Sequence, residues 1–174
     1  MPAHKEASPA AAIGRLESIQ ISNGGVPKRT IQGAVEVTTK GLAGDRQRDL
    51  RFHGGPDRAV CLFSRERIEA LRSEGHPIDH GTTGENLTLA GLDWAEVRTG
   101  ARLAVGAVVL EITKPAHPCK NIAPSFADGD FSRLSAKRPE GLSRMYARVL
   151  VPGVIRAGDR VALLRSLPPG SIQS

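Results

Sequence analysis

The chain has 174 residues, the size of one domain with a substantial core, and carries a formal net charge of +6 with a pI near 9.9. Arginine makes up 18 of the 24 basic residues, which suits phosphate or carboxylate groups, but an aromatic content of 3% argues against a nucleic-acid polymer as partner. Two cysteines exclude a disulfide framework, and no apolar run is long enough for a membrane-spanning helix.

Short strands dominate the predicted secondary structure. Alternating or β-branched apolar residues predict strands at 15–22, 34–39, 58–63, 86–89, 102–105, 107–113, 145–151 and 160–164. A helix is predicted over 65–74, because Ser64 can cap its first turn and Gly75 can end it, and a short helix over 131–137. We therefore expect a mainly β, barrel-like fold with a few short helices. Strands and helices do not alternate as βαβ units, so a Rossmann-like domain is not expected.

The two ends of the chain are expected to lie outside the folded domain. Residues 1–12 are small, polar and proline-containing, and they lack the apolar core of a signal peptide. Residues 166–174 are rich in Pro, Gly and Ser. We expect two flexible tails around a single domain at 13–165, in a cytoplasmic protein.

Cys119 is the residue that says most about chemistry. It follows a predicted strand in the segment KPAHPCKN, where two prolines restrict the backbone and Lys120 comes directly after the sulfur. A nearby cation favours a thiolate over a thiol. Cys61 lies instead in the apolar run AVCLF, and we expect it to be a buried structural residue.

A single thiolate beside a cation has three possible uses. It can be a nucleophile, a persulfide carrier, or one protein ligand to a soft metal whose other ligands come from a cofactor. As a nucleophile, Cys119 would need a base, and His117 could serve because residues i and i+2 of an extended segment share a face. No oxyanion-stabilising or orienting group can be identified beside this pair. The residues alone leave all three uses open.

Three glycine-rich segments predict places where the backbone can approach an anion. They read GLAGDR at 41–46, HGGPDR at 53–58 and GENL at 84–87. Adjacent glycines allow positive φ, and successive N–H groups can then form an anion nest. In the second segment, His53, Asp57 and Arg58 would place an acid–base group, an acceptor and a cation around such a nest. A tight turn with a solvated charge pair has the same pattern.

Several common metal and cofactor sites have no counterpart in the sequence. It has no His-Glu-x-x-His motif, no P-loop, and no flavin or nicotinamide fingerprint, and two cysteines cannot hold an iron–sulfur cluster. His76 and His80 have the spacing of helical zinc ligands, but Pro77 argues against a shared helical face. A pyridoxal phosphate site is not expected either. If the protein does redox work, its electrons must come from a partner.

Taken together, these segments resemble the MOSC family, named after the C-terminal domain of molybdenum cofactor sulfurase. The matching stretches are GDR at 44–46, HGGPDRAV at 53–60, GENLT at 84–88 with Gly91, LEIT at 110–113 leading to Pro118-Cys119, and MYARV at 145–149 followed by Gly158-Asp159. One such motif would mean little, but five in the family's order make the resemblance specific. The likeness is to the stand-alone bacterial type.

The resemblance implies a barrel-like MOSC fold with a cleft for the pterin-based molybdenum cofactor, molybdopterin, and a cysteine that supplies the protein's sulfur ligand to molybdenum. Characterised members reduce N-hydroxylated compounds, including hydroxylaminopurine-type bases and amidoximes, with electrons from a separate flavin or haem protein. The expected function is therefore a molybdenum-dependent oxidoreductase acting on small molecules. A cofactor that brings its own sulfurs and a phosphate needs one thiolate, an anion nest and arginines from the protein.

The expected site residues combine the segments with this resemblance. Cys119, Asp57 and His53 are the expected catalytic residues, and Cys119 is also the expected metal ligand. The expected cofactor-binding residues are Arg46, Gly54, Gly55, Arg58, Asn86, Lys120 and Arg148. Two alternatives stay open: a sulfur carrier or sulfurtransferase that holds a persulfide on Cys119, as was also proposed for this domain, and a non-catalytic cofactor-binding domain.

Overall fold

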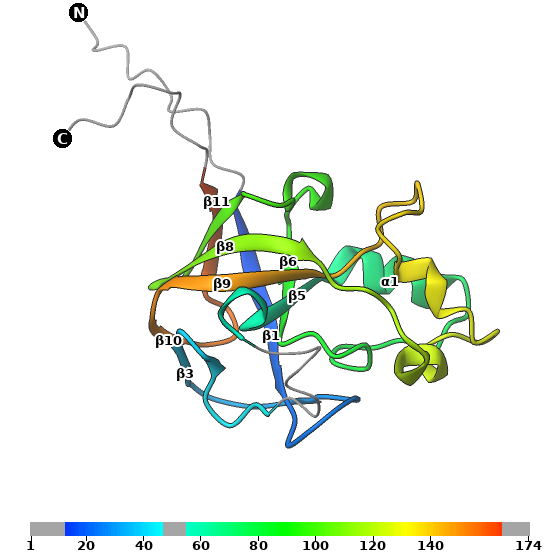
Figure 1. Cartoon of the computed structure of the whole chain (residues 1–174), viewed down its shortest axis with the longest axis horizontal. Helices are drawn as coiled ribbons and strands as arrows, with labels where there is room; N and C mark the ends of the chain where they lie inside the picture. Colours follow the sequence, from blue (N-terminus) through cyan, green and yellow to red (C-terminus); the bar gives the residue numbers. More distant parts are fainter. Residues whose placement is uncertain (1–12, 47–54, 165–174) are drawn as a thin grey trace, which may run out of the picture.

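The computed structural model describes residues 13–46 and 55–164, and its main element is a sheet that closes on itself (Figure 1). Its strands, in sheet order, are β11 (Arg160–Leu164), β7 (Arg102–Val105), β8 (Val108–Pro115), β9 (Met145–Val151), β5 (Val60–Ser64), β6 (Leu87–Ala90) and β1 (Ile13–Ile21). β1 also pairs with β11, which closes the barrel. The mainly β, barrel-like fold expected from the sequence is confirmed.

Shorter strands extend this barrel. β2 (Arg29–Thr30) pairs with the end of β1, and a separate small sheet contains β10 (Gly153–Ile155), β3 (Val35–Thr38) and β4 (Gly41–Leu42). The tails predicted at 1–12 and 166–174 lie outside the described residues. No helix in the described ranges is long and apolar enough to cross a membrane.

Residues 13–46 and 55–164 contain one α-helix and several 3-10 turns. They are α1 (Arg65–Ser73), η1 (Pro56–Arg58), η2 (Trp94–Glu96), η3 (Lys120–Ser125) and η4 (Phe131–Leu134). Ser64 caps α1 as predicted, because its side chain accepts a hydrogen bond from the Arg67 N–H at 3.2 Å. The strand predicted from residue 58 begins at Val60, since η1 occupies the residues before it. The helix predicted over 131–137 is only the 3-10 turn η4, because the backbone becomes extended at Ser135.

One prediction about topology was wrong. The structure does contain a βαβ unit: β5 and β6 pair in parallel, and α1 is the crossover between them. α1 turns the buried side chains of Ile68 and Leu71 towards the protein interior. All other strand pairs in the described part of the chain are antiparallel, so this one unit does not make the domain Rossmann-like.

Side chains along the strands point alternately to the barrel core and to the opposite face of the sheet. In β8, Val108, Leu110 and Ile112 point inward and are buried, and the alternation ends where the chain leaves the sheet at Pro115. Across β5 and β9, Cys61 is directly opposite Tyr146. Because successive residues point to opposite faces, this pair lies on the face away from the fully buried neighbours in the core.

Candidate functional site

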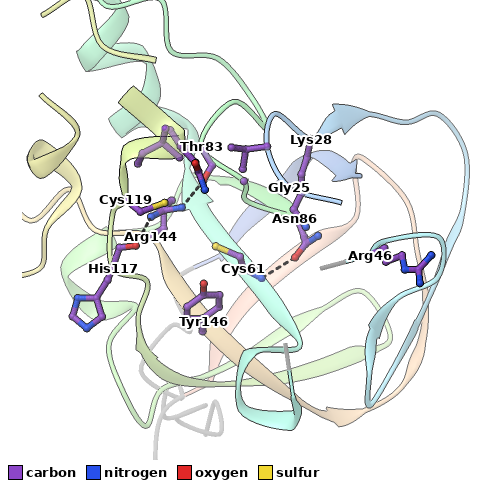
Figure 2. A pocket seen from close by; sticks show the side chains of 14 residues that line it. Gly25, Lys28, Arg46, Cys61, Thr83, Asn86, His117, Cys119, Arg144 and Tyr146 are labelled. Atoms are coloured by element: carbon purple, nitrogen blue, oxygen red, sulfur yellow. Dashed lines mark hydrogen bonds between the residues drawn. The ribbon is translucent and has the colours of Figure 1, made fainter. Parts of the chain in front are cut away.

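A cavity of about 260 Å³ lies where the ends of several strands converge (Figure 2). Its walls come from the segment after β1 (Gly25, Val26, Lys28), the segment after β4 (Arg46), β5 (Cys61), the residues before β6 (Thr83, Gly84, Asn86), the segment after β8 (His117, Cys119, Asn121, Ile122) and the start of β9 (Arg144, Tyr146). Among the described residues that line it, three are Lys or Arg and none is Asp or Glu. The cavity is therefore suited to an anionic ligand.

Cys119 reaches this cavity because the chain leaves β8 just before it. The residue is extended, with φ −137° and ψ 170°, and the 3-10 helix η3 begins at the next residue. The side chain is half-buried and lines the cavity, as does the exposed His117. Lys120 is exposed and is not among the lining residues. The thiol singled out in the sequence is thus presented to a cavity.

Cys61 is buried, as predicted, but it has a second property that the sequence did not reveal. Its side chain lines the same cavity as Cys119, and Figure 2 shows both sulfurs on the cavity walls. Cys61 is 5% exposed, and burial raises the pKa of its thiol to about 11. At neutral pH the cavity therefore contains Cys61 as a protonated thiol.

Iodoacetamide is expected to modify Cys119 in the folded protein and to spare Cys61. A thiol with a pKa of about 11 is a thiolate in only about one molecule in a thousand at pH 8, and this one is also buried. Peptide mass spectrometry after brief labelling measures the two sites, with denatured protein as the control in which both react. Labelling of Cys61 in native protein at the rate of Cys119 would contradict this assignment.

A buried ion pair supports one side of the cavity. Lys28 Nζ lies 2.8 Å from both carboxylate oxygens of Asp45, and the two side chains are 7% and 4% exposed. The Ser22 N–H donates to Asp45 Oδ1 at 3.0 Å. The carboxylate is thus held by a cation and by backbone, which compensates its removal from water. This pair joins the segment after β1, which contains Lys28, to Asp45, the residue directly before Arg46.

Asn86 belongs to the same network, and its amide is fully occupied by protein groups. Its Nδ2 donates to Asp45 Oδ2 at 2.9 Å and to the Gln20 carbonyl at 3.2 Å. Its Oδ1 accepts from the Cys61 N–H at 3.0 Å. Asn86 therefore lines the cavity while joining β1, β5 and the Asp45 carboxylate.

Arg144 connects the opposite side of the cavity to the Cys119 segment. One guanidinium nitrogen donates to the Thr83 carbonyl, and Nη2 donates to the His117 carbonyl at 3.3 Å. The Arg144 carbonyl accepts from the Ala116 N–H at 2.9 Å. Arg144 is 6% exposed, and its Nε is buried without a hydrogen-bond partner. The cavity thus contains a buried cation with unused donor capacity.

The predicted site residues divide into two groups. Cys119, Arg46 and Asn86 line the cavity, whereas Gly55, Asp57, Arg58, Lys120 and Arg148 are not among its lining residues. His53 and Gly54 lie outside the described residues, so the predictions on them stay predictions.

Three charged residues of the second group, Asp57, Arg58 and Arg148, lie in η1 and β9. Asp57 is exposed, and its carboxylate is 3.4 Å from Arg148 Nη2, while Arg148 Nε is 3.5 Å from Glu111. Arg58 stacks on the ring of Tyr146, with its guanidinium carbon 5.8 Å from the ring centre. Since Tyr146 lines the cavity, Arg58 contacts a residue of the cavity wall without lining the cavity itself.

Sequence reasoning missed Lys28, Thr83, Arg144 and Tyr146 as lining residues. No motif marks Arg144 or Lys28, because their roles depend on contacts with distant parts of the chain. Thr83 precedes the GENL segment by one residue, and Tyr146 lies within MYARV, so proximity to those stretches was the available signal.

The fold and the site together define a class of protein, namely closed β barrels with a thiol in a cationic cavity. The family model for the MOSC domain matches residues 49–162, and the chain belongs to the MOSC domain family. The uncharacterized protein YflK of Bacillus subtilis is 33% identical over 141 residues, which are 80% of this chain and 63% of YflK. The crystal structure of YiiM from Geobacillus stearothermophilus superposes with a TM-score of 0.71 at 25% identity, covering 87% of this chain and 75% of YiiM.

A protein named reductase from Gibberella moniliformis is 30% identical over 159 residues, which are 83% of this chain but only 26% of that protein. The chain thus spans less than two thirds of both YflK and this reductase. The family match begins at residue 49, yet β1 pairs with β6 and β11 in the same barrel. The family expected from the motifs is confirmed, and membership is consistent with a role in binding the molybdenum cofactor.

Proposed function

We propose that this cavity binds a molybdenum pterin cofactor through Cys119 and that the protein reduces N-hydroxylated small molecules. The observation that supports this most directly is the half-buried thiol of Cys119 in a cavity whose charged lining residues, among those that the structure describes, are all cationic. Membership of the MOSC family and the similarity to a protein named reductase support the same function.

The donor groups fit such a cofactor. In residues 13–46 and 55–164, no group of three or more His, Cys, Asp or Glu could hold a metal ion by itself. Cys119 supplies one soft ligand, which suits a metal whose remaining ligands belong to a cofactor. The cations Arg46 and Arg144 suit anionic groups, whereas the charge of Lys28 is balanced by Asp45, and the unpartnered Nε of Arg144 leaves donor capacity in the wall.

The lining residues are arranged in two groups that match two ends of a cofactor. Figure 2 shows His117, Cys119 and Arg144 together, with Lys28 and Arg46 away from them. Cys119 would hold the metal, and Arg46 would hold the phosphate. When bound, the molybdenum centre would supply the electron pair for the reduction.

The proposed reaction is R–NHOH + 2 e⁻ + 2 H⁺ → R–NH2 + H2O. The N–O bond breaks, nitrogen gains a proton, and the oxygen leaves as water. Both electrons come from a separate flavin or haem protein. Hydroxylaminopurine-type bases and amidoximes are the proposed substrates, and the chain's own tasks are to bind them, exclude water and deliver protons.

The test is the cofactor content of protein purified from one host that makes the molybdenum cofactor and one that does not. We expect equimolar molybdenum and oxidised pterin only in protein from the first host, together with reduction of hydroxylaminopurine by a chemical electron donor. Folded protein from the competent host that contains neither molybdenum nor pterin would refute the proposal. Stable cofactor without any turnover would identify a non-catalytic binding domain.

A second candidate function is persulfide transfer, and the second thiol in the cavity favours it. Cys61 lines the same cavity as Cys119, so a persulfide on Cys119 would have a second sulfur within the site. Sulfur released by cyanide from the wild type but not from Cys119→Ser would support this function. Equal release from both proteins would count against it.

A further inference from the structure

The region around the cavity contains two buried carboxyl groups with opposite surroundings. Asp45 is paired with Lys28 at 2.8 Å, as described above. Glu85 is 0% exposed, and within the described residues no Lys or Arg forms an ion pair with it. A buried carboxylate without a cationic partner is costly, and the usual response is to retain the proton. In contrast to Asp45, burial without an ion-pair partner favours the protonated form of Glu85.

The groups that face Glu85 are few and can be named. Its Oε1 accepts from the Gly81 N–H, and Thr83 Oγ1 lies 2.5 Å from its Oε2. Arg144 is the cation acting on Glu85, but its Nη1 and Nη2 donate to the carbonyls of Thr83 and His117. Burial raises the pKa of the Glu85 carboxyl, and the hydrogen bonds and Arg144 oppose that shift only in part.

Thr83 connects this buried carboxyl to the cavity. Thr83 lines the cavity, whereas Glu85 is not among the lining residues. A hydroxyl both donates and accepts, so it can pass a proton from one side to the other without moving its oxygen. Gly81, whose N–H donates to Glu85, has φ +81°, and a Cβ there would lie 2.2 Å from the Lys28 carbonyl. Gly81 therefore has no room for a side chain.

We propose that Glu85 is a proton store for the cavity and that the Thr83 hydroxyl transfers its proton to the substrate oxygen. This inference rests on the proposed reductase function. That reaction takes up two protons, and the donor protein supplies the electron pair. The Glu85 O–H bond breaks as a new Thr83 O–H bond forms. The original Thr83 proton goes to the N–OH oxygen, which leaves as water when the N–O bond breaks. The nitrogen takes its proton from solvent, and Glu85 is reprotonated through Thr83.

The other titratable groups that line the cavity are less suited to donate this proton, apart from one rival donor that the kinetic test can separate from Glu85. Burial raises the pKa of Cys61 to about 11 and that of Tyr146 to about 12, too far from neutrality for efficient transfer. Lys28 is engaged by Asp45. His117 is exposed at the cavity and is the rival proton donor.

The proton store can be tested on the cofactor-free protein. Infrared spectra recorded in H2O and D2O at pH 7 are expected to show the C=O band of a protonated carboxylic acid, shifted on deuteration and absent from Glu85→Gln. Glutamine keeps the shape and can still accept from the Gly81 N–H, so this variant is expected to fold. A wild type without this band overturns the proposal, whether or not the protein is a reductase.

The transfer path is tested by kinetics on the cofactor-loaded protein. Thr83→Val and Glu85→Gln are each expected to lower kcat by about 100-fold, with KM and molybdenum content unchanged, and Thr83→Ser is expected to restore most of the rate. A loss in His117→Gln that is missing in Glu85→Gln overturns the path. A wild type that shows the infrared band but reduces no N-hydroxylated compound rejects the reductase function and with it the path, while the protonated carboxyl stands.

Discussion

Replacing Cys119 by serine is expected to remove molybdenum from the protein and to lower reductase activity by at least about 100-fold, with the fold intact. Loss of an outer partner of a metal ligand already costs up to about 100-fold in affinity or activity, so loss of the ligand itself should cost no less. The hydroxyl of serine is a harder donor and holds a soft metal poorly. Cys119 is half-buried at the start of η3 rather than in the core, so folding should survive.

The matched control is Cys61→Ala, which removes the other thiol of the same cavity. Cys61 is protonated at neutral pH and buried in β5, so its loss should cost stability of about 1 kcal/mol and leave the molybdenum content unchanged. Metal analysis, circular dichroism and reductase assays on both variants make the comparison. Equimolar molybdenum in Cys119→Ser would reject Cys119 as the metal ligand, and loss of molybdenum in both variants would point to a disturbed cavity rather than a specific ligand.

The fold was predictable where local pattern and tertiary environment agree. β8 alternates between buried and half-exposed residues, so its period of two is visible in the sequence. β5 is buried along its whole length, which gives a continuous apolar run with no period, and its parallel pairing with β6 depends on a crossover that composition does not reveal. β2, with two residues, exists only because it pairs with β1.

The site was predictable to the extent that chemistry is visible in neighbouring residues. Cys119 could be singled out from its prolines and lysine, and the structure places it in the cavity. Sequence cannot tell which way a charged side chain points: Asp57 turns to the surface and pairs with Arg148 instead of lining the cavity. Arg144 shows the opposite case, because its role comes from two carbonyls, those of Thr83 and His117, that are distant in sequence.

Replacing Asp45 by asparagine is expected to destabilise the protein by about 3–5 kcal/mol, because the charge of Lys28 then stays buried without a partner. The exposed pair of Asp57 and Arg148 provides the control: with side chains 62% and 45% exposed, Asp57→Asn should change stability by less than about 1 kcal/mol. Urea unfolding followed by circular dichroism measures both. Equal losses in the two variants would show that burial of the Lys28–Asp45 pair has no special weight.

A double-mutant cycle separates the ion pair from the rest of the Asp45 network. Lys28→Met removes the buried cation, and the double variant Lys28→Met/Asp45→Asn removes both charges, so its loss of stability should be smaller than the sum of the single losses. The remaining loss reports the contacts of Asp45 with Ser22 and Asn86, which hold the cavity wall beside Cys61. Strictly additive losses would mean that Lys28 and Asp45 act independently. The wall would then be held by the amide network of Asn86, and the cation at Lys28 would be available to a ligand rather than committed to the fold.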